Sequence, residues 1–295
     1  MGISVAEAEE RVSFIKKVKE FGEKRIGLNF CGSFETYNPN PKYPYWLYVS
    51  DRDGVNNVLK HPYIGSMGNE RMMVTMAKSF EVLGYDAYLF TAEAWGGGMC
   101  PILPRLIHAP PERQVYVVLH EGWHCTSWNF GRTHPYAFEE AAGIVIGAFG
   151  SMLFAKEYGD KNLEHSIERF ISSGFGFYDW INASCRAIRD MYMSAAFDSV
   201  TEEDKEMMRK SIFARLWKES GQFREWVRPI ARAHFSQPIN NAFFVRYRNY
   251  STYQKLMREA AIKLSGIDAI MDAFTHIPDK RTSAKKYFEN IVSCI

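Results

Sequence analysis

Residues 112–158 read ERQVYVVLHEGWHCTSWNFGRTHPYAFEEAAGIVIGAFGSMLFAKEY, and this stretch decides the fold of the chain. Residues 112–128 have the pattern of a helix that the apolar run 115–119 anchors to a core. A polar turn follows over 129–135. Residues 136–158 are apolar on most sides, which predicts a second helix buried in the core. Two helices joined by a short turn therefore form the centre of the predicted fold.

Around this helix pair the sequence predicts further helices and a small amount of β-structure. Apolar residues among charges predict an amphipathic helix over 5–24, which Gly27 ends. A strand-like stretch at 45–49 interrupts an irregular region, and a helix over 69–83 precedes a short strand over 86–91. Later helices are expected at 161–172, 176–197, 201–221, 239–248, 250–264 and 266–275.

The five residues from His120 to His124 have the spacing of a zinc-binding helix. Histidines at positions i and i+4 project from one helical face, so two imidazoles can bind a single ion at about 2.0–2.1 Å. Glu121 lies one step round the helix, where a carboxylate can act as general base on a water molecule. The motif predicts a zinc-dependent hydrolase, and in particular a peptidase.

The expected elements and this motif together predict the fold class. It is mainly α with a small β element before the His-Glu-x-x-His helix (α+β, zincin-like). The expected domains are an N-terminal α+β part over 1–110 and a helical catalytic part over 111–295. No linker separates the two parts, so one continuous domain is the alternative.

A catalytic zinc ion usually has three protein ligands, so a third is needed. Metzincins have a histidine six residues after the motif, whereas this chain has Phe130 there, and His134 lies in the turn. Cys125 follows the motif but points about 100° away on a helix, which favours a buried structural thiol. Glu139 and Glu140 begin the next helix, and a short turn would bring both back toward the motif.

Several segments resemble one known family. The sequence Phe-Glu-Glu-Ala-Ala-Gly at 138–143 is similar to the Phe-Asn-Glu-Ser-Phe-Ala segment that follows His-Glu-Leu-Ala-His in the bacterial predicted zinc aminopeptidases, a gluzincin-like group. Upstream, 61–65 and 76–87 look like the family's Pro-x-x-Gly and its Ala-rich helix ending in Gly-x-Asp. Downstream, Asn-Asn-Ala at 240–242, followed by a tyrosine, is also similar.

The resemblance implies an aminopeptidase with His120, His124 and Glu140 as ligands of one zinc ion and Glu121 as general base. The chain departs from the family at 92–99, where it has Glu-Ala-Trp-Gly-Gly-Gly in place of Tyr-Ser-Thr-Leu-Gly. This loop is expected to border the substrate cleft, so the chain is a divergent member, and the resemblance does not determine its substrate.

Other roles are predicted for residues outside the motif. A tyrosine or histidine donor would stabilise the oxyanion, and the candidates in order are Tyr247, Tyr250 and His234. Glu93 is expected to bind the α-ammonium group of the substrate. Five arginines could bind a carboxylate or phosphate, namely Arg224, Arg228, Arg232, Arg246 and Arg248, but the spacing of the first three at intervals of four favours a solvated helical face.

Two other functions remain open. An amidase or other zinc metallohydrolase would keep the metal but act on a non-peptide substrate, and a non-enzymatic scaffold would keep a metal-binding site alone. A di-iron carboxylate site needs a second Glu-x-x-His motif, which the sequence lacks.

Cysteine usage and the N-terminal sequence predict a cytoplasmic protein. The motif and the family resemblance imply a peptide or small amide as its substrate. The formal net charge of +2 argues against a nucleic-acid partner. Five scattered cysteines without a CxxC pair favour reduced thiols, and no secretion signal is visible. The apolar stretch 141–155 is shorter than the roughly 20 residues that span a bilayer, so no membrane association is expected. The oligomeric state is left open.

Overall fold

The computed structural model describes residues 4–96, 98–131, 134–159, 161–223, 226 and 239–294. Two compact units interleave along the chain: unit 1 contains 1–41, 93–172 and 252–295, and unit 2 contains 42–92 and 173–251. The boundary near residue 110 between independently folding parts stays a prediction. The structure is mainly helical with one three-stranded antiparallel sheet, which confirms the mainly α class with a small β element.

Unit 1 is helical throughout its regular structure. Its helices are α1 (Val5–Phe21), the π-helix η1 (Gly22–Ile26), α3 (Pro104–Ile107), α4 (Pro111–Asn129), α5 (Tyr136–Tyr158), the first part of α6 (Lys161–Tyr192), α11 (Gln254–Leu264), α12 (Ile267–Thr275) and α13 (Arg281–Cys294). Ser4 accepts a hydrogen bond from the Glu7 backbone and so starts α1, while Gly27 at φ 80° ends η1 as predicted. The sequence did not predict α13.

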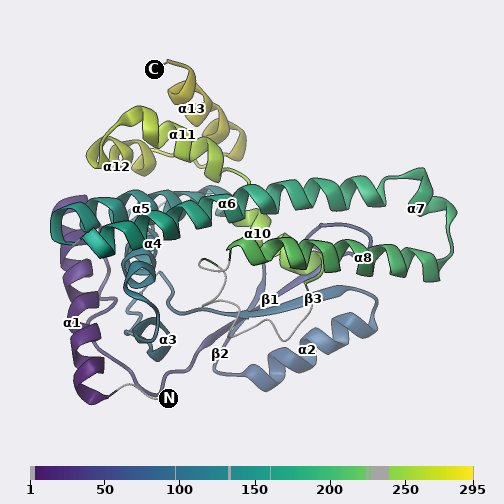
Figure 1. The fold of residues 1–295 in the computed structure, drawn as a ribbon, viewed down its shortest axis with the longest axis horizontal. Coiled ribbons are helices and arrows are strands. Elements are labelled where there is room, and N and C mark those ends of the chain that lie inside the picture. The colour runs from purple at the N-terminus through teal and green to yellow at the C-terminus, as the bar shows by residue number, and fades with distance from the viewer. Residues whose placement is uncertain are drawn as a thin grey trace. The chain divides into compact units, whose positions relative to one another are not determined.

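Helices α4 and α5 form the core of unit 1 (Figure 1). Val115, Val118 and Leu119 of α4 are fully buried, as are most apolar residues of α5, which confirms the predicted core position of both helices. Three C-terminal helices pack in the same unit, where Phe138 stacks on Tyr253 with ring centroids 3.8 Å apart.

Among the described helices, α5 alone is long and apolar enough to cross a membrane, but 72% of its most apolar 18-residue window is buried within the protein. A core helix of a soluble protein passes the same test. The burial therefore explains its composition without a bilayer.

Unit 2 is built on a sheet with strand order β2-β1-β3. The strands are β1 (Pro44–Ser50), β2 (Ile64–Met67) and β3 (Asp86–Thr91), and the helices are α2 (Glu70–Val82), the rest of α6, α7 (Ala195–Ser199), α8 (Glu202–Ser220), the short 3-10 helix η2 (Gly221–Phe223) and α10 (Asn241–Ser251). The sequence predicted β1 and β3 but missed β2, and it divided α6 into two helices.

Alternation along the strands of unit 2 gives the sheet two different faces. Leu47 and Val49 of β1 lie with Ala87 and Leu89 of β3 against α2, forming a small aliphatic core (Figure 1). The opposite face is aromatic, because Trp46 pairs with Phe90 and Tyr48 with Tyr88 in the antiparallel register.

Asp86 at the start of β3 joins three elements of unit 2. Its carboxylate accepts hydrogen bonds from Arg209 of α8 at 3.1 Å and from the Asn241 backbone at the start of α10 at 3.0 Å. Asn240 donates its side-chain amide to the Ala87 carbonyl at 2.9 Å. The Asn-Asn pair that resembled a family segment therefore holds α10 on the sheet.

Candidate metal centre

The two motif histidines lie one turn apart on the same face of α4. Their Nε2 atoms face each other at 3.1 Å, and His120 is buried whereas His124 is half-buried. Two nitrogens that are each about 2.0–2.1 Å from a tetrahedral ion lie about 3.4 Å apart. The helix therefore places both nitrogens at a separation that suits one shared ion.

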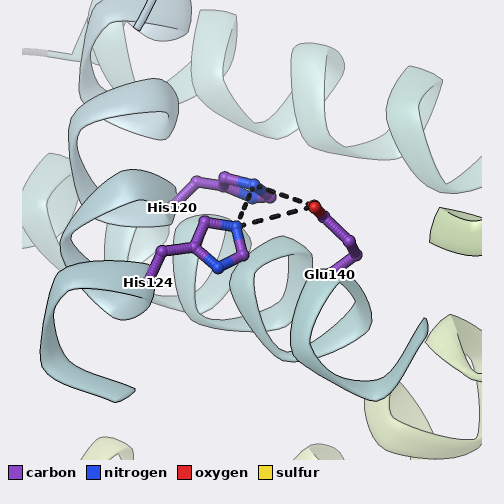
Figure 2. Close-up of side chains that lie close together, drawn as sticks. All are labelled: His120, His124 and Glu140. Atoms are coloured by element: carbon purple, nitrogen blue, oxygen red, sulfur yellow. Dashed lines mark hydrogen bonds and ion pairs between the residues drawn. The ribbon is translucent and has the colours of Figure 1, made fainter. Parts of the chain in front are cut away.

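Glu140 of α5 supplies a third donor atom at the same point (Figure 2). Its Oε2 lies 3.7 Å from Nε2 of His120 and 3.5 Å from Nε2 of His124, and the three ligand atoms lie within 4.8 Å of one another. Among the described residues, this buried oxygen has no hydrogen-bond partner. A buried carboxylate oxygen without a donor is costly unless a cation satisfies it, so this donor set fits a metal ion.

A glycine on α5 allows this approach. A Cβ atom at Gly143 would lie 2.9 Å from Cε1 and 3.0 Å from Nδ1 of the His120 ring. Gly147, one turn further, lies against Tyr116 of α4 in the same way. The His120 ring thus packs directly on the α5 backbone, one turn beyond Glu140.

The motif's variable positions are used for packing. Gly122 lies so close to Phe30 that a Cβ atom would come within 2.7 Å of its ring. Trp123 is fully buried, with its ring 6.2 Å from that of Phe274. Cys125 is also fully buried, as predicted for a structural thiol.

Glu139 occupies a different position from Glu140. Its Oε1 lies 3.0 Å from Nδ1 of His124, on the ring atom opposite the nitrogen that faces Glu140. Ser127 of α4 donates its hydroxyl to the other carboxylate oxygen at 2.9 Å. Glu139 therefore orients the His124 ring, whereas Glu140 points at the Nε2 atoms of both histidines. The two glutamates, which the sequence left as alternative ligands, thus contact opposite sides of the His124 ring.

Glu121 is held by the loop before α4. The backbone N–H of Gly96 donates to its carboxylate. Gly96 also packs so closely on Cβ of His124 that no side chain fits there. Burial raises the pKa of Glu121, although the neighbouring histidines oppose this shift. The loop in which the chain departs from the family pattern thus touches both Glu121 and a candidate ligand.

Charges within the cluster shift the pKa values of its members in opposite directions. Burial alone would lower the pKa of His124, but the carboxylates of Glu140 and Glu139 raise it well above its usual value. Burial alone would raise the pKa of Glu140, but the charge of His124 and the nearby imidazoles of both histidines hold it below its usual value. The site therefore favours a cation beside an ionised Glu140.

Glu93 and Tyr247, which the sequence also predicted as site residues, contact other side chains in the structure. Glu93 forms an ion pair with Arg113 of α4 at 2.8 Å, so it already contacts a cation within unit 1. Tyr247 lies in unit 2, buried beside Phe177 and Phe243 at ring distances of 5.0 and 4.8 Å. The roles predicted for Glu93 and Tyr247 stay predictions.

Two further candidates, Tyr250 and His134, are not part of the candidate metal centre. Tyr250 also belongs to unit 2, with its ring centroid 6.4 Å from that of Tyr247. His134 is half-buried in the turn before α5 and is not among the three residues grouped as a possible metal site. His234 lies outside the described residues.

Comparison with known proteins identifies the family. A family model described as "Putative aminopeptidase" matches residues 60–281, which is well over half of the chain. The chain belongs to this family. Comparisons with curated proteins and with solved structures found no match. Membership supports a peptidase-like, hydrolytic function, and the matched range includes the three residues of the candidate metal centre.

Gly143 and Ser127 are site residues that sequence reasoning missed. Gly143 stands three residues after Glu140, and Ser127 three residues after His124, so both lie on the site-facing side of their helices. Helical spacing from the candidate ligands was the signal that could have found them.

We predict that Gly143→Ala weakens zinc binding roughly tenfold or more, because the added methyl group displaces the His120 ring. Gly147→Ala is the matched control, since its Cβ would meet Tyr116 rather than the His120 ring itself. Both variants overpack the same helix pair, which typically costs about 1–3 kcal/mol. Zinc affinity is measured by competition with a chelator, and thermal unfolding gives the stability. Equal zinc affinities for the two variants would contradict the prediction.

Glu139→Gln is expected to lower zinc affinity by roughly 10–100-fold, because the His124 ring loses its charged partner. Ser127→Ala should give a smaller loss of the same kind. Glu157→Gln at the other end of α5, where Glu157 pairs with Arg25, should leave zinc affinity unchanged. The same chelator competition measures all three variants, and an unchanged affinity in Glu139→Gln would show that this carboxylate does not position His124.

Proposed function

We propose that the protein is a zinc-dependent aminopeptidase of the gluzincin type with a zincin-like catalytic helix. The observation that supports this most is the convergence of His120, His124 and Glu140 beside Glu121 in a member of an aminopeptidase family. The family supports peptide hydrolysis, and the donor set suits zinc, for which two histidines and one glutamate are a known catalytic ligand set.

In this proposal His120, His124 and Glu140 hold one zinc ion, which when bound polarises a carbonyl group and lowers the pKa of a water molecule. Glu121 takes a proton from the attacking water and later gives it to the leaving amine. The Gly96 backbone lies against Glu121 and opposes the rise of its pKa on burial, and this favours the ionised form that a base needs. Glu139 acts as a positioning residue, because it fixes the ring of His124.

A second candidate function is an amidase acting on a non-peptide substrate. The observation that favours it is the contact of Gly96 with His124 and Glu121, because this glycine belongs to the segment that differs from the family pattern. A changed loop at this position alters the surroundings of the reacting group without altering the ligands. The substrate in either case is a peptide or small amide, and we place the protein in the cytoplasm on the basis of its composition.

Glu121→Gln is expected to keep the zinc ion and lose hydrolysis by roughly 10²–10⁴-fold in kcat, because the amide cannot accept the proton from water. Glu112→Gln, in the first turn of the same helix, is the matched control with unchanged activity. Metal content by mass spectrometry and turnover of an aminoacyl substrate are measured on the same samples. If Glu121→Gln keeps full activity, the proposed base is wrong, and if the parent protein binds zinc but shows no hydrolysis, the scaffold alternative holds.

We predict that fluorogenic aminoacyl amides with a free α-amino group are hydrolysed faster than their N-acetylated forms. An aminopeptidase must bind the α-ammonium group, whereas an amidase of the second kind has no such requirement. A panel of aminoacyl amides, N-acyl amides and longer peptides at equal concentration gives kcat/KM for each. Hydrolysis confined to N-acyl amides would support the amidase and reject the aminopeptidase.

A further inference from the structure

The aromatic face of the sheet in unit 2 contains a buried cation. Arg246 of α10 is 4% exposed, and its guanidinium carbon lies 3.4 Å from the ring centroid of Phe90. Tyr48 at 5.8 Å, Tyr247 at 4.4 Å and Tyr250 at 5.3 Å surround the same group. We call Arg246 and these four rings the arginine box, and all of it lies within unit 2.

Arg246 has no counter-ion among the described residues. Its Nε and Nη1 atoms are buried without a hydrogen-bond partner. Contacts with aromatic faces offset part of the cost of burying a cation, but they leave in-plane N–H donors unsatisfied. The two other buried arginines in the described chain, Arg113 and Arg209, both pair with carboxylates.

A second unsatisfied donor lies close by. The Tyr88 side chain is fully buried and its hydroxyl has no hydrogen-bond partner in the described chain. Tyr88 interacts electrostatically with Arg246, and it lies on the same sheet face as Phe90, two residues along β3. Two donor groups that lie in one place without acceptors among the described residues make this a candidate binding site for a ligand that supplies an acceptor.

We propose that Arg246, together with Tyr88, binds the carboxylate group of a small ligand whose apolar part contacts the rings of the arginine box. One guanidinium balances one negative charge, and its fork of N–H donors matches a carboxylate. A phosphate monoester has a charge near −2 at neutral pH. The guanidinium would leave one of these charges unbalanced, and the negative faces of the surrounding rings would repel it. The carboxylate comes from a free acid or from the C-terminus of a peptide.

Isothermal titration of the full-length protein tests this site, with and without added zinc. N-acetyl-L-phenylalanine is the first probe, and its amide, which lacks only the carboxylate, is the matched comparison. We expect the acid to bind at least tenfold more tightly than the amide in both metal states. Equal affinities for acid and amide, or no saturable binding of the acid, would overturn the proposal. Because zinc is not required for this binding, the outcome is separate from that of the proposed hydrolysis.

Arg246→Met removes the charge and keeps a side chain of similar shape, and it should lose at least tenfold in affinity for the acid. Arg248→Met is the control, since the Arg248 side chain donates instead to the Val55 carbonyl at 2.6 Å. Retained binding in Arg246→Met would overturn the proposal. If Arg246→Met does not fold, the acid and amide comparison on the unaltered protein decides alone.

Two further probes identify the source of the carboxylate. Tighter binding of a dipeptide free acid than of 3-phenylpropionate would assign the site to peptide C-termini, and the reverse order would assign it to free acids. Phenyl phosphate should bind more weakly than either. If it binds most tightly, the ligand is a dianion and the proposed carboxylate is wrong.

Discussion

The close approach of α4 and α5 is the constraint on which the metal centre depends. Glycines at 143, 147 and 150 leave the α5 backbone open to side chains of α4, namely the rings of His120 and Tyr116 and the end of Leu119. Helix pairs are usually separated by about 8–10 Å, depending on the side chains between them. With three glycines at the contact, a carboxylate at the start of α5 comes within 4 Å of imidazoles on α4.

The position of the two carboxylates at the N-terminal end of α5 has an electrostatic reason. The first turn of a helix favours negative charge, because its N–H groups are not used within the helix. Glu139 stands in this turn and Glu140 directly follows it, whereas residues 141–155 of the same helix contain no charge. Both acids can therefore be ionised although the rest of the helix is apolar. The imidazoles of His120 and His124 on α4 stabilise their negative charge further.

The sequence predicted that the residues of the candidate metal centre would lie close together, because the rules that bring them together are local. The spacing of His120 and His124 sets their common face, and a short turn returns Glu139 and Glu140 to that face. Whether Glu139 or Glu140 points at the cluster depends on the rotation of α5 about its axis, which packing decides. The pairing of Glu93 with Arg113 and the strand β2 depend on contacts between segments distant in sequence, so periodicity could not find them.

Resemblance to a family predicts chemistry more securely than substrate, and the structure gives the physical reason. The segments that resemble the family serve different ends: 138–143 supplies Glu140 to the candidate metal centre, whereas Asn240 and Asn241 fix α10 to the sheet through Asp86 and Ala87. Metal ligands must meet at one point within tenths of an ångström, so their types and spacing allow few changes. A group that recognises substrate needs only a complementary surface, which a loop such as that around Gly96 can change without disturbing the ligands.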